Sequence, residues 1–326
     1  MPLIPWDLDP SRLCSGASTK PPFRHQHNTS RALAVGDVLL EQRRGTSFSG
    51  IGQAEFEKRW VGRTASGDVY MPEFCSAIHG LRRELSCPPF DRFSEMAFPR
   101  LLSFSVASRF GLADSWPEIL MSVRAFQPSR EERFLGLTDS GFILDPVQCA
   151  PFYEWMTERI LSESDLPICV RENLGGWSYR NERQDTLRTV RKSAEFLRDE
   201  YVFVGTGEHV HALRAQLLEA FCSLLGRKDL TFRVVVGAGC FQAEEETLSR
   251  NLRRVSKVSD IPILDVEMFL PETEEWLEVA GSSLWGSRLT DAFNIRSTEG
   301  RLESGCMGVG ISRLALAILA QGEHSD

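Results

Sequence analysis

The sequence predicts an α+β fold in which a mostly antiparallel β-sheet is flanked by helices. Strand-like runs follow one another along the second half of the chain, instead of alternating regularly with helices as they do in a parallel βαβ sheet. Helical periodicity is strongest at 206–225 and recurs at 308–321, near the end of the chain. We therefore expect one sheet with its helices segregated around it.

Length and composition indicate a globular protein. The 326 residues are 42% hydrophobic and include 20 Phe and 7 Trp, which is enough apolar surface for a large core. The net charge of −8 disfavours a protein that binds nucleic-acid phosphates broadly. The sequence has neither a signal peptide nor a run of roughly 20 apolar residues, so we expect a cytoplasmic protein without membrane contact.

The patterns divide the chain at residue 44. Residues 1–44 are predicted to form a proline-rich N-terminal arm and a first helix, and residues 45–326 the main domain. In the main domain we expect helices at 73–85, 152–161, 206–225 and 308–321, and strands at 93–98, 141–149 (running into a turn), 177–180, 200–204, 232–236, 263–269 and 276–279.

Specific residues in the sequence support two of these predicted elements. Thr206 is a good N-cap for the helix that follows it, and Gly226 is placed to end that helix. The runs 177–180 and 200–204 flank a polar, arginine-rich stretch, which suggests two antiparallel strands with a long connection.

Some charged residues suggest a phosphate-binding site. The segment 303–319 carries glycines where a strand passes into a helix, and Arg313 in the first turns of that helix favours an anion. Arg180 and Glu182 are two apart on a predicted strand and can meet one ligand together, although a surface ion pair is the simpler interpretation. Glu278 on another strand can hold Mg²⁺ between phosphates.

These segments together resemble motifs 2 and 3 of the class II aminoacyl-tRNA synthetases. Within that class they resemble the atypical zinc-dependent seryl-tRNA synthetases and their truncated bacterial relatives, the amino acid:[carrier protein] ligases. The stretch 145–153 (DPVQCAPFY) is similar to the P-x-x-C-x-P-x-Y segment of those enzymes, 96–99 (MAFP) to motif 1, and 304–306 (SGC) to the S/T-G-C before motif 3. The resemblance implies that 45–326 is a class II synthetase-like catalytic domain.

The resemblance also implies a zinc site. It selects Cys149, Glu200 and Cys306 as ligands, which leaves a fourth tetrahedral position open for the α-amino group of a substrate. The other six cysteines have no CxxC spacing and are expected to be buried apolar thiols. They are Cys14, Cys75, Cys87, Cys169, Cys222 and Cys240.

An ATP site follows from the same resemblance. Arg180 is expected to hold the amino-acid carboxylate and the α-phosphate, and Phe196 and Arg313 to sandwich the adenine. Glu182 is expected near the adenine and Glu278 at Mg²⁺. Lys192 is expected at the outer phosphates, where most of these enzymes have arginine, with Arg188 or Arg191 as its alternatives. Ser283 stands where asparagine is common.

The reaction implied is ATP-dependent activation of a small amino acid as an aminoacyl adenylate, with AMP released on transfer. Because the chain has neither a predicted coiled-coil arm nor a basic balance, tRNA is expected to be an unlikely partner. We expect a homodimeric amino acid:[carrier protein] ligase that loads the phosphopantetheine thiol of an acidic carrier. Arg214 and Arg227 on the helix 206–225 are expected to form its docking surface, with a plain scaffold helix as the alternative.

Two other functions stay open from the sequence. The adenylate can pass its aminoacyl group to another acceptor, either a small molecule or tRNA. A non-catalytic synthetase paralogue that binds or regulates is the third hypothesis, against which the presence of Arg180, Glu278 and Arg313 argues.

Overall fold

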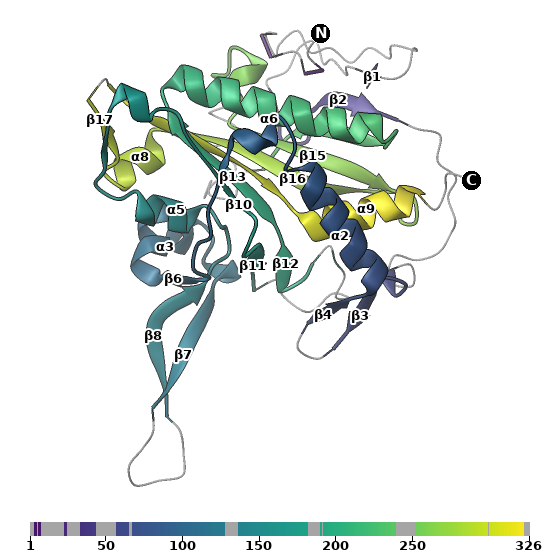
Figure 1. The fold of residues 1–326 in the computed structure, drawn as a ribbon, viewed down its shortest axis with the longest axis horizontal. Coiled ribbons are helices and arrows are strands. Elements are labelled where there is room, and N and C mark those ends of the chain that lie inside the picture. Colours follow the sequence, from purple (N-terminus) through teal and green to yellow (C-terminus); the bar gives the residue numbers. More distant parts are fainter. Residues whose placement is uncertain are drawn as a thin grey trace.

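A computed structural model describes residues 3–4, 6–7, 23–24, 33–43, 57–64, 67–127, 136–181, 190, 192–238, 252–298 and 300–322. Its centre is a nine-stranded sheet with the order β1-β2-β14-β15-β16-β18-β13-β10-β5 (Figure 1). The strands are β1 (Phe23–Arg24), β2 (Val38–Gln42), β14 (Phe232–Val236), β15 (Ile263–Leu270), β16 (Glu275–Gly286), β18 (Glu303–Val309), β13 (Asp199–Gly205), β10 (Ile168–Glu172) and β5 (Ser94–Glu95). All neighbours are antiparallel except β5 and β10, so the predicted mostly antiparallel α+β sheet is confirmed.

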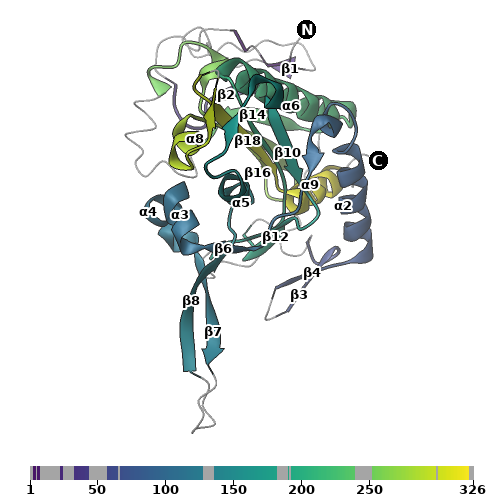
Figure 2. The same cartoon turned by 60° about the vertical axis from the view of Figure 1, so that its left-hand side comes forward.

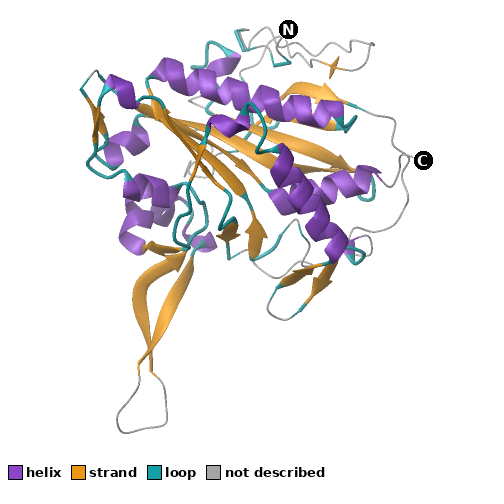
Figure 3. Cartoon of the chain, in the orientation of Figure 1, coloured by secondary structure: helices purple, strands orange, loops and turns teal. Residues whose placement is uncertain are grey.

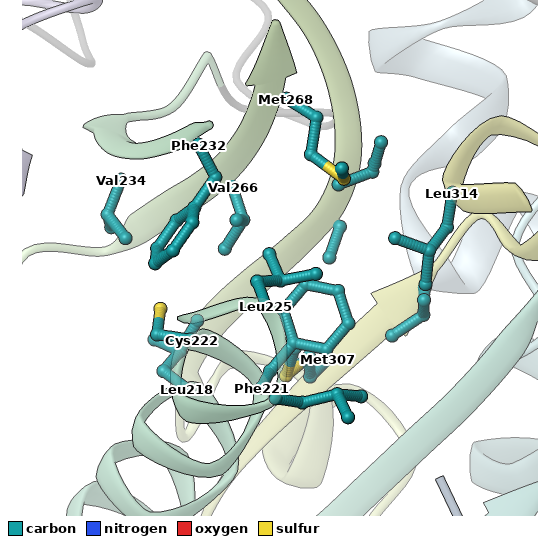
Figure 4. Packing of buried hydrophobic residues seen from close by; sticks show 14 of the residues in the cluster. Leu218, Phe221, Cys222, Leu225, Phe232, Val234, Val266, Met268, Met307 and Leu314 are labelled. Carbon is teal, nitrogen blue, oxygen red and sulfur yellow. The ribbon is translucent and has the colours of Figure 1, made fainter. Parts of the chain in front are cut away.

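Three helices cover one face of this sheet. They are α6 (Gly207–Arg227), α9 (Ile311–Gly322) and α2 (Pro72–Glu84), and Figure 3 shows that the helices lie around the strands and not between them. Their apolar side chains pack on alternate strand residues, as Phe221 and Leu225 do with Val266 and Met307 (Figure 4). Thr206 caps α6, because its hydroxyl accepts a hydrogen bond from the His209 backbone N–H.

A second core lies on the opposite face. It joins Val202 and Val204 of β13 to α3 (Phe104–Phe110), α5 (Ala150–Trp155) and α8 (Arg288–Ala292), whereas Tyr201 and Phe203 of β13 belong to the first core. The short helix α4 (Leu112–Ser115) follows α3. The small sheet β6 (Leu101–Ser103), β8 (Gly136–Leu144) and β7 (Met121–Gln127) projects from this side as a hairpin (Figure 2).

Three two-stranded sheets complete the described part of the fold. They are β3 (Val61–Arg63) with β4 (Asp68–Tyr70), β9 (Ile160–Leu161) with β17 (Arg296–Ser297), and β11 (Trp177–Tyr179) with β12 (Glu195–Leu197). Short 3₁₀ turns lie at Phe90–Arg92, Pro117–Ile119, Glu163–Asp165 and Val258–Asp260. None of the helices that the structure describes is both long and apolar enough to cross a membrane.

Three predicted elements are corrected. The first helix expected in 1–44 is wrong at Val38–Gln42, which forms β2, because Leu39 and Leu40 are both fully buried when the strand adds to β14. The strand at 177–179 pairs with β12 and not with 200–204, since β13 takes its place between β10 and β18. Helix α6 continues through Gly226 to Arg227.

Candidate active site

A cavity of about 440 Å³ opens on the face of the sheet opposite α6 and α9. Strands β15, β16 and β18 form its floor, where Gly281 and Gly308 lie opposite each other. The turn before α5 and the β11–β12 pair supply its walls. Of the predicted site residues, the cavity brings together Cys149, Arg180, Phe196, Glu278, Cys306 and Arg313.

Two thiols and a carboxylate meet at one end of the cavity. One ligand atom each from Cys149, Glu200 and Cys306 lies within 4.8 Å of the others, and all three residues are buried. Cys149 directly precedes α5, Glu200 lies on β13 and Cys306 on β18, so three separate segments supply the cluster. Ligand atoms around a single zinc ion lie about 3.5–4 Å apart, so small side-chain shifts suffice to bind one.

The cluster is electrostatically unfavourable without a cation. Burial, with the neighbouring Cys306 and Glu200, raises the pKa of the Cys149 thiol well above its usual range. Burial likewise raises the pKa of Glu200, against which Arg198 acts by Coulomb attraction. A divalent ion would stabilise the deprotonated ligands, so this donor set fits zinc.

Arg198 is a site residue that the sequence analysis did not identify. Its Nε lies 2.7 Å from Glu200 Oε2, and it lines the cavity beside Gly308. A Cβ atom at Gly308 would overlap the Arg198 guanidinium, so this glycine makes room for the arginine. The available sequence signal was that Arg198 and Glu200 are two apart on one strand-like run.

The predicted ATP end of the cavity is built on Phe196. The Arg180 guanidinium carbon lies 5.2 Å from the centre of the Phe196 ring and 5.0 Å from that of Trp116. Its Nε also donates to the Pro146 carbonyl at 3.2 Å. The Arg313 guanidinium carbon lies 5.9 Å from the Phe196 ring, so both arginines flank the same aromatic side chain.

Of the remaining predicted ATP contacts, one lies at the cavity and the others do not line it or are not described. Glu278 is half exposed at the cavity, with its Oε2 3.9 Å from Arg313 Nη1. Lys192 is exposed and is not among the residues that line the cavity. Glu182 lies outside the described residues, as do the alternatives Arg188 and Arg191.

Asp265 also lines the cavity and was missed by the sequence analysis. It lies on β15 directly opposite Gly281 of β16. Two residues further along β16, Ser283 lies opposite Cys306 of β18. Burial and the nearby Glu278 raise the pKa of Asp265 well above its usual range. The alternation of residues along a short apolar run does not by itself indicate that Asp265 lines a cavity.

The expected docking surface on α6 is wrong at Arg214. That side chain is only 1% exposed, and its Nη1 donates to the Ile261 carbonyl at 2.6 Å, while Arg227 is exposed. Arg214 lies three and four positions before Leu217 and Leu218, so helical spacing puts it on the apolar face. Of the expected buried thiols, Cys222 is fully buried but Cys87 is exposed, and Cys14 and Cys240 lie outside the described residues.

Comparison with known proteins gives a consistent group of relatives. The chain is 32% identical over 202 residues to the type-2 serine–tRNA ligase of Methanopyrus kandleri, a match covering 58% of this chain and 37% of the relative. It is 28% identical over 253 residues to that of Methanocaldococcus jannaschii, covering 70% and 47%. The matched regions thus span about half the length of these relatives or less. No sequence model of a protein family matches the chain.

A solved structure extends the likeness to the fold. The M. kandleri seryl-tRNA synthetase, in its complex with A. aeolicus tRNASec, matches with a TM-score of 0.78 and 27% identity. The match covers 89% of this chain and 60% of that one. The expected carrier-protein ligase function is therefore corrected, as is the expectation that tRNA is an unlikely partner: the homologues are tRNA ligases, and this structural neighbour is bound to a tRNA.

Fold and sequence therefore agree with each other. The antiparallel sheet and its flanking helices superpose on a synthetase, and the sequence match reaches the level of homology. The chain has the class II aminoacyl-tRNA synthetase fold and is homologous to the catalytic core of the type-2 seryl-tRNA ligases.

Proposed function

We propose that the protein activates a small amino acid with ATP and transfers the aminoacyl group to tRNA. The observation that carries this proposal is that Arg180, Phe196 and Arg313 share one cavity with the buried Cys149–Glu200–Cys306 cluster. Such a cavity has a metal-ligand set at one end and an aromatic ring between two guanidinium groups at the other. These features suit an amino acid and a nucleotide respectively.

At the amino-acid end, Cys149, Glu200 and Cys306 would hold zinc. When bound, the ion supplies an open position for the substrate α-amino group. Arg198 holds one oxygen of Glu200 and thereby orients this ligand. The indole rings of Trp116 and Trp285 and the side chain of Val147 close in the space nearby, which favours a small substrate side chain.

Arg180 is proposed to align the two reacting groups. Its guanidinium is held by Trp116, Phe196 and the Pro146 carbonyl, so its charge is already oriented before substrates bind. The substrate carboxylate attacks the α-phosphorus, an aminoacyl adenylate forms, and pyrophosphate leaves. Alignment and charge stabilisation suffice for this step without a protein nucleophile.

At the nucleotide end, Phe196 and Arg313 are proposed to hold the adenine between them. Glu278 would bind Mg²⁺ that neutralises the phosphates. Glu182 and Lys192 stay proposed contacts to the adenine and the outer phosphates. The class II resemblance also leads us to propose that the active species is a homodimer.

The argument for tRNA as the acceptor of the aminoacyl group comes from the relatives. Those named above are serine–tRNA ligases, so serine is the first amino acid to test and a terminal ribose hydroxyl of tRNA the first acceptor. In the second step that hydroxyl attacks the adenylate carbonyl, forming an ester and releasing AMP.

The test is ATP–pyrophosphate exchange on the zinc-loaded protein with serine, glycine, alanine and larger amino acids. We expect exchange with one or a few small amino acids, followed by aminoacylation of tRNA with the same one. Arg313→Ala should lower the exchange rate by ~100-fold or more. Arg301→Ala, which alters an exposed surface ion pair with Asp291, serves as the matched control. Absence of exchange with every amino acid would overturn the proposal. Exchange without tRNA charging would overturn the acceptor alone.

A further inference from the structure

Arg100 and Asp145 form a largely buried ion pair outside the cavity lining. Arg100 directly precedes β6 and Asp145 directly follows β8, and the Asp145 backbone N–H donates to the Arg100 carbonyl at 2.9 Å. The Arg100 Nη1 lies 3.1 Å from Asp145 Oδ2, and the aspartate side chain is fully buried. Neither residue is among those that line the cavity, so any role in the reaction must act through other residues.

Asp145 begins a turn that carries three groups of the candidate active site. The Pro146 carbonyl accepts a hydrogen bond from Arg180 Nε, the Val147 side chain lines the cavity, and Cys149 belongs to the zinc-ligand cluster. The Val147 backbone N–H donates to Asp145 Oδ1 at 3.1 Å. The Asp145 carboxylate therefore fixes this turn from inside, with one oxygen on the turn and the other on Arg100.

The same pair also fixes the strand that leads to Arg180. The Tyr179 backbone N–H donates to the Asp145 carbonyl at 3.0 Å, and Arg100 Nη1 donates to the Trp177 carbonyl at 3.2 Å. Both bonds hold β11, and Arg180 directly follows this strand. Arg180 is thus attached to the pair twice, through its own backbone segment and through the Pro146 carbonyl.

Arg100 extends the network to the strand beside the third zinc ligand. Its Nη2 lies 3.0 Å from Glu172 Oε2, and Glu172 of β10 lies directly opposite Glu200 of β13. Arg100 Nη2 also donates to the Phe98 carbonyl at 2.9 Å. One guanidinium thereby joins segments that are far apart in the sequence and that surround the cavity, a task for which its planar set of donors is suited.

We propose that Arg100 and Asp145 are positioning residues that set the zinc ligand Cys149 and the substrate-aligning Arg180 relative to each other. A metal ligand and a phosphate-binding arginine must keep a fixed separation for the substrate carboxylate to reach the α-phosphorus. The turn 145–149 and the end of β11 carry these two groups, and the pair bonds to both segments. The Arg180 part of this inference rests on the proposed function, whereas the zinc part does not.

The simpler alternative is an ion pair that stabilises the fold and nothing more. Asp199 gives a matched comparison, because it is also fully buried and accepts from two arginines, Arg82 at 3.1 Å and Arg171 at 3.2 Å. It directly precedes the ligand Glu200, but strand alternation turns its side chain to the opposite face of the sheet, towards α2. A general loss of stability would affect variants of Asp145 and Asp199 alike.

The experiment compares Asp145→Asn with Asp199→Asn in the full chain. Measurements are made at about pH 8, where the Asp145 carboxyl, with its pKa of about 6, is ionised. Both Asp145 oxygens face donors, so the amide NH₂ of asparagine would meet either the Val147 N–H or the Arg100 guanidinium. We expect Asp145→Asn to lower zinc affinity about 10-fold, measured by competition with a chelator, and to alter the absorption spectrum of the Co²⁺-substituted protein. Asp199→Asn should change neither.

Exchange kinetics test the part that concerns Arg180. With zinc saturating, Asp145→Asn should still exchange ATP and pyrophosphate about 10-fold more slowly than the wild type at saturating substrates, because Arg180 is no longer aligned. Asp199→Asn should exchange at a rate close to that of the wild type. A wild-type rate in zinc-saturated Asp145→Asn would overturn the role assigned to the pair at Arg180.

A second variant keeps the test decisive should Asp145→Asn fail to fold. Arg100→Lys keeps the positive charge near Asp145 and Glu172 but cannot donate to the Trp177 and Phe98 carbonyls at the same time. We expect it to change zinc affinity and the Co²⁺ spectrum in the same direction. Unchanged values in Arg100→Lys would then overturn the proposal, as would zinc affinity in Asp145→Asn that is no weaker than in Asp199→Asn.

Failure of this inference is distinguishable from failure of the proposed function. Zinc affinity and the Co²⁺ spectrum are measured without substrates, so they report on the pair even if exchange fails with every amino acid. If exchange is seen in the wild type and Asp145→Asn retains both its zinc affinity and its exchange rate, the function stands and this inference is overturned.

Discussion

Arg198 and Glu200 form an ion pair inside the candidate active site, with the arginine Nε 2.7 Å from the carboxylate Oε2. Glu200 lies near the start of β13 and Arg198 directly precedes this strand, and their two-residue spacing directs both side chains to the cavity face of the sheet. The carboxylate is fully buried, so the arginine partly offsets the cost of its charge and limits its orientation.

Gly308→Ala should disturb that pair without removing either partner. The new methyl group would overlap the Arg198 guanidinium and displace it from Glu200, so we expect zinc affinity to fall about 10-fold. Competition with a chromophoric chelator measures this affinity. Gly80→Ala in α2 is the control, because the added Cβ would meet no atom within 4 Å beyond its chain neighbours and the backbone of its own helix, and it should leave zinc affinity unchanged. Equal zinc affinity in the two variants would contradict the prediction.

Cys306→Ala should lose the metal and the activity together. Two remaining ligands bind zinc much more weakly than three, so we expect well under one zinc per chain and no detectable exchange. Elemental analysis and Co²⁺ absorption report the site directly. Cys222→Ala, on the buried face of α6, should retain zinc. Full zinc content in Cys306→Ala would rule this site out.

Arg180→Ala and Arg313→Ala should each lower the exchange rate by ~100-fold or more, because each removes a positioned donor for phosphate charge. Neither guanidinium lies in the main core, so thermal unfolding should change little. Exchange kinetics at saturating ATP and amino acid give the rate. Near-normal rates in both variants would show that the arginines around Phe196 do not handle the substrates.

Asp145 should make stability fall as the pH rises from 4 to 6. Burial raises the pKa of Asp145 in the folded protein to about 6 from its usual value of 3.8, against the opposing charge of Arg100. The folded state therefore binds this proton more tightly than the unfolded chain does. The associated stabilisation is complete below about pH 4 and lost above about pH 6, an effect of about 2–3 kcal/mol.

Asp145→Asn should remove this contribution. Urea unfolding of both proteins between pH 4 and 7 measures it, as the difference between their unfolding free energies at each pH. We expect that difference to shift in favour of the variant as the pH rises through this window. A constant difference would show that Asp145 is ionised over the whole range.

Arg214→Ala should destabilise the fold by about 2–4 kcal/mol, because it leaves a cavity under α6 and deprives the Ile261 carbonyl of its donor. Arg227→Ala on the exposed end of the same helix should stay within about 0.5 kcal/mol of the wild type. Chemical denaturation compares the two. Similar small changes in both would mean that the buried guanidinium contributes nothing net.

Local patterns in the sequence were sufficient for elements whose signal lies within a few residues. The cap at Thr206, the apolar stripe of α6 and the strand Phe232–Val236 depend on side-chain spacing along one segment. The resemblance named Cys149, Glu200 and Cys306 although they come from three segments, and the structure brings them together. Their place in the cavity still required the sheet.

Contacts between distant segments were decided by the tertiary structure. β11 pairs with β12, and β2 joins the sheet as a strand, because strand pairing depends on which apolar faces remain to be covered. Asp265 and Glu278 converge only through the register of β15 and β16 over Gly281. Arg214 is buried because the loop before β15 packs against α6 and supplies carbonyl acceptors. Periodicity records which face of an element is apolar, but the neighbour that covers that face is set by the free energy of the whole fold.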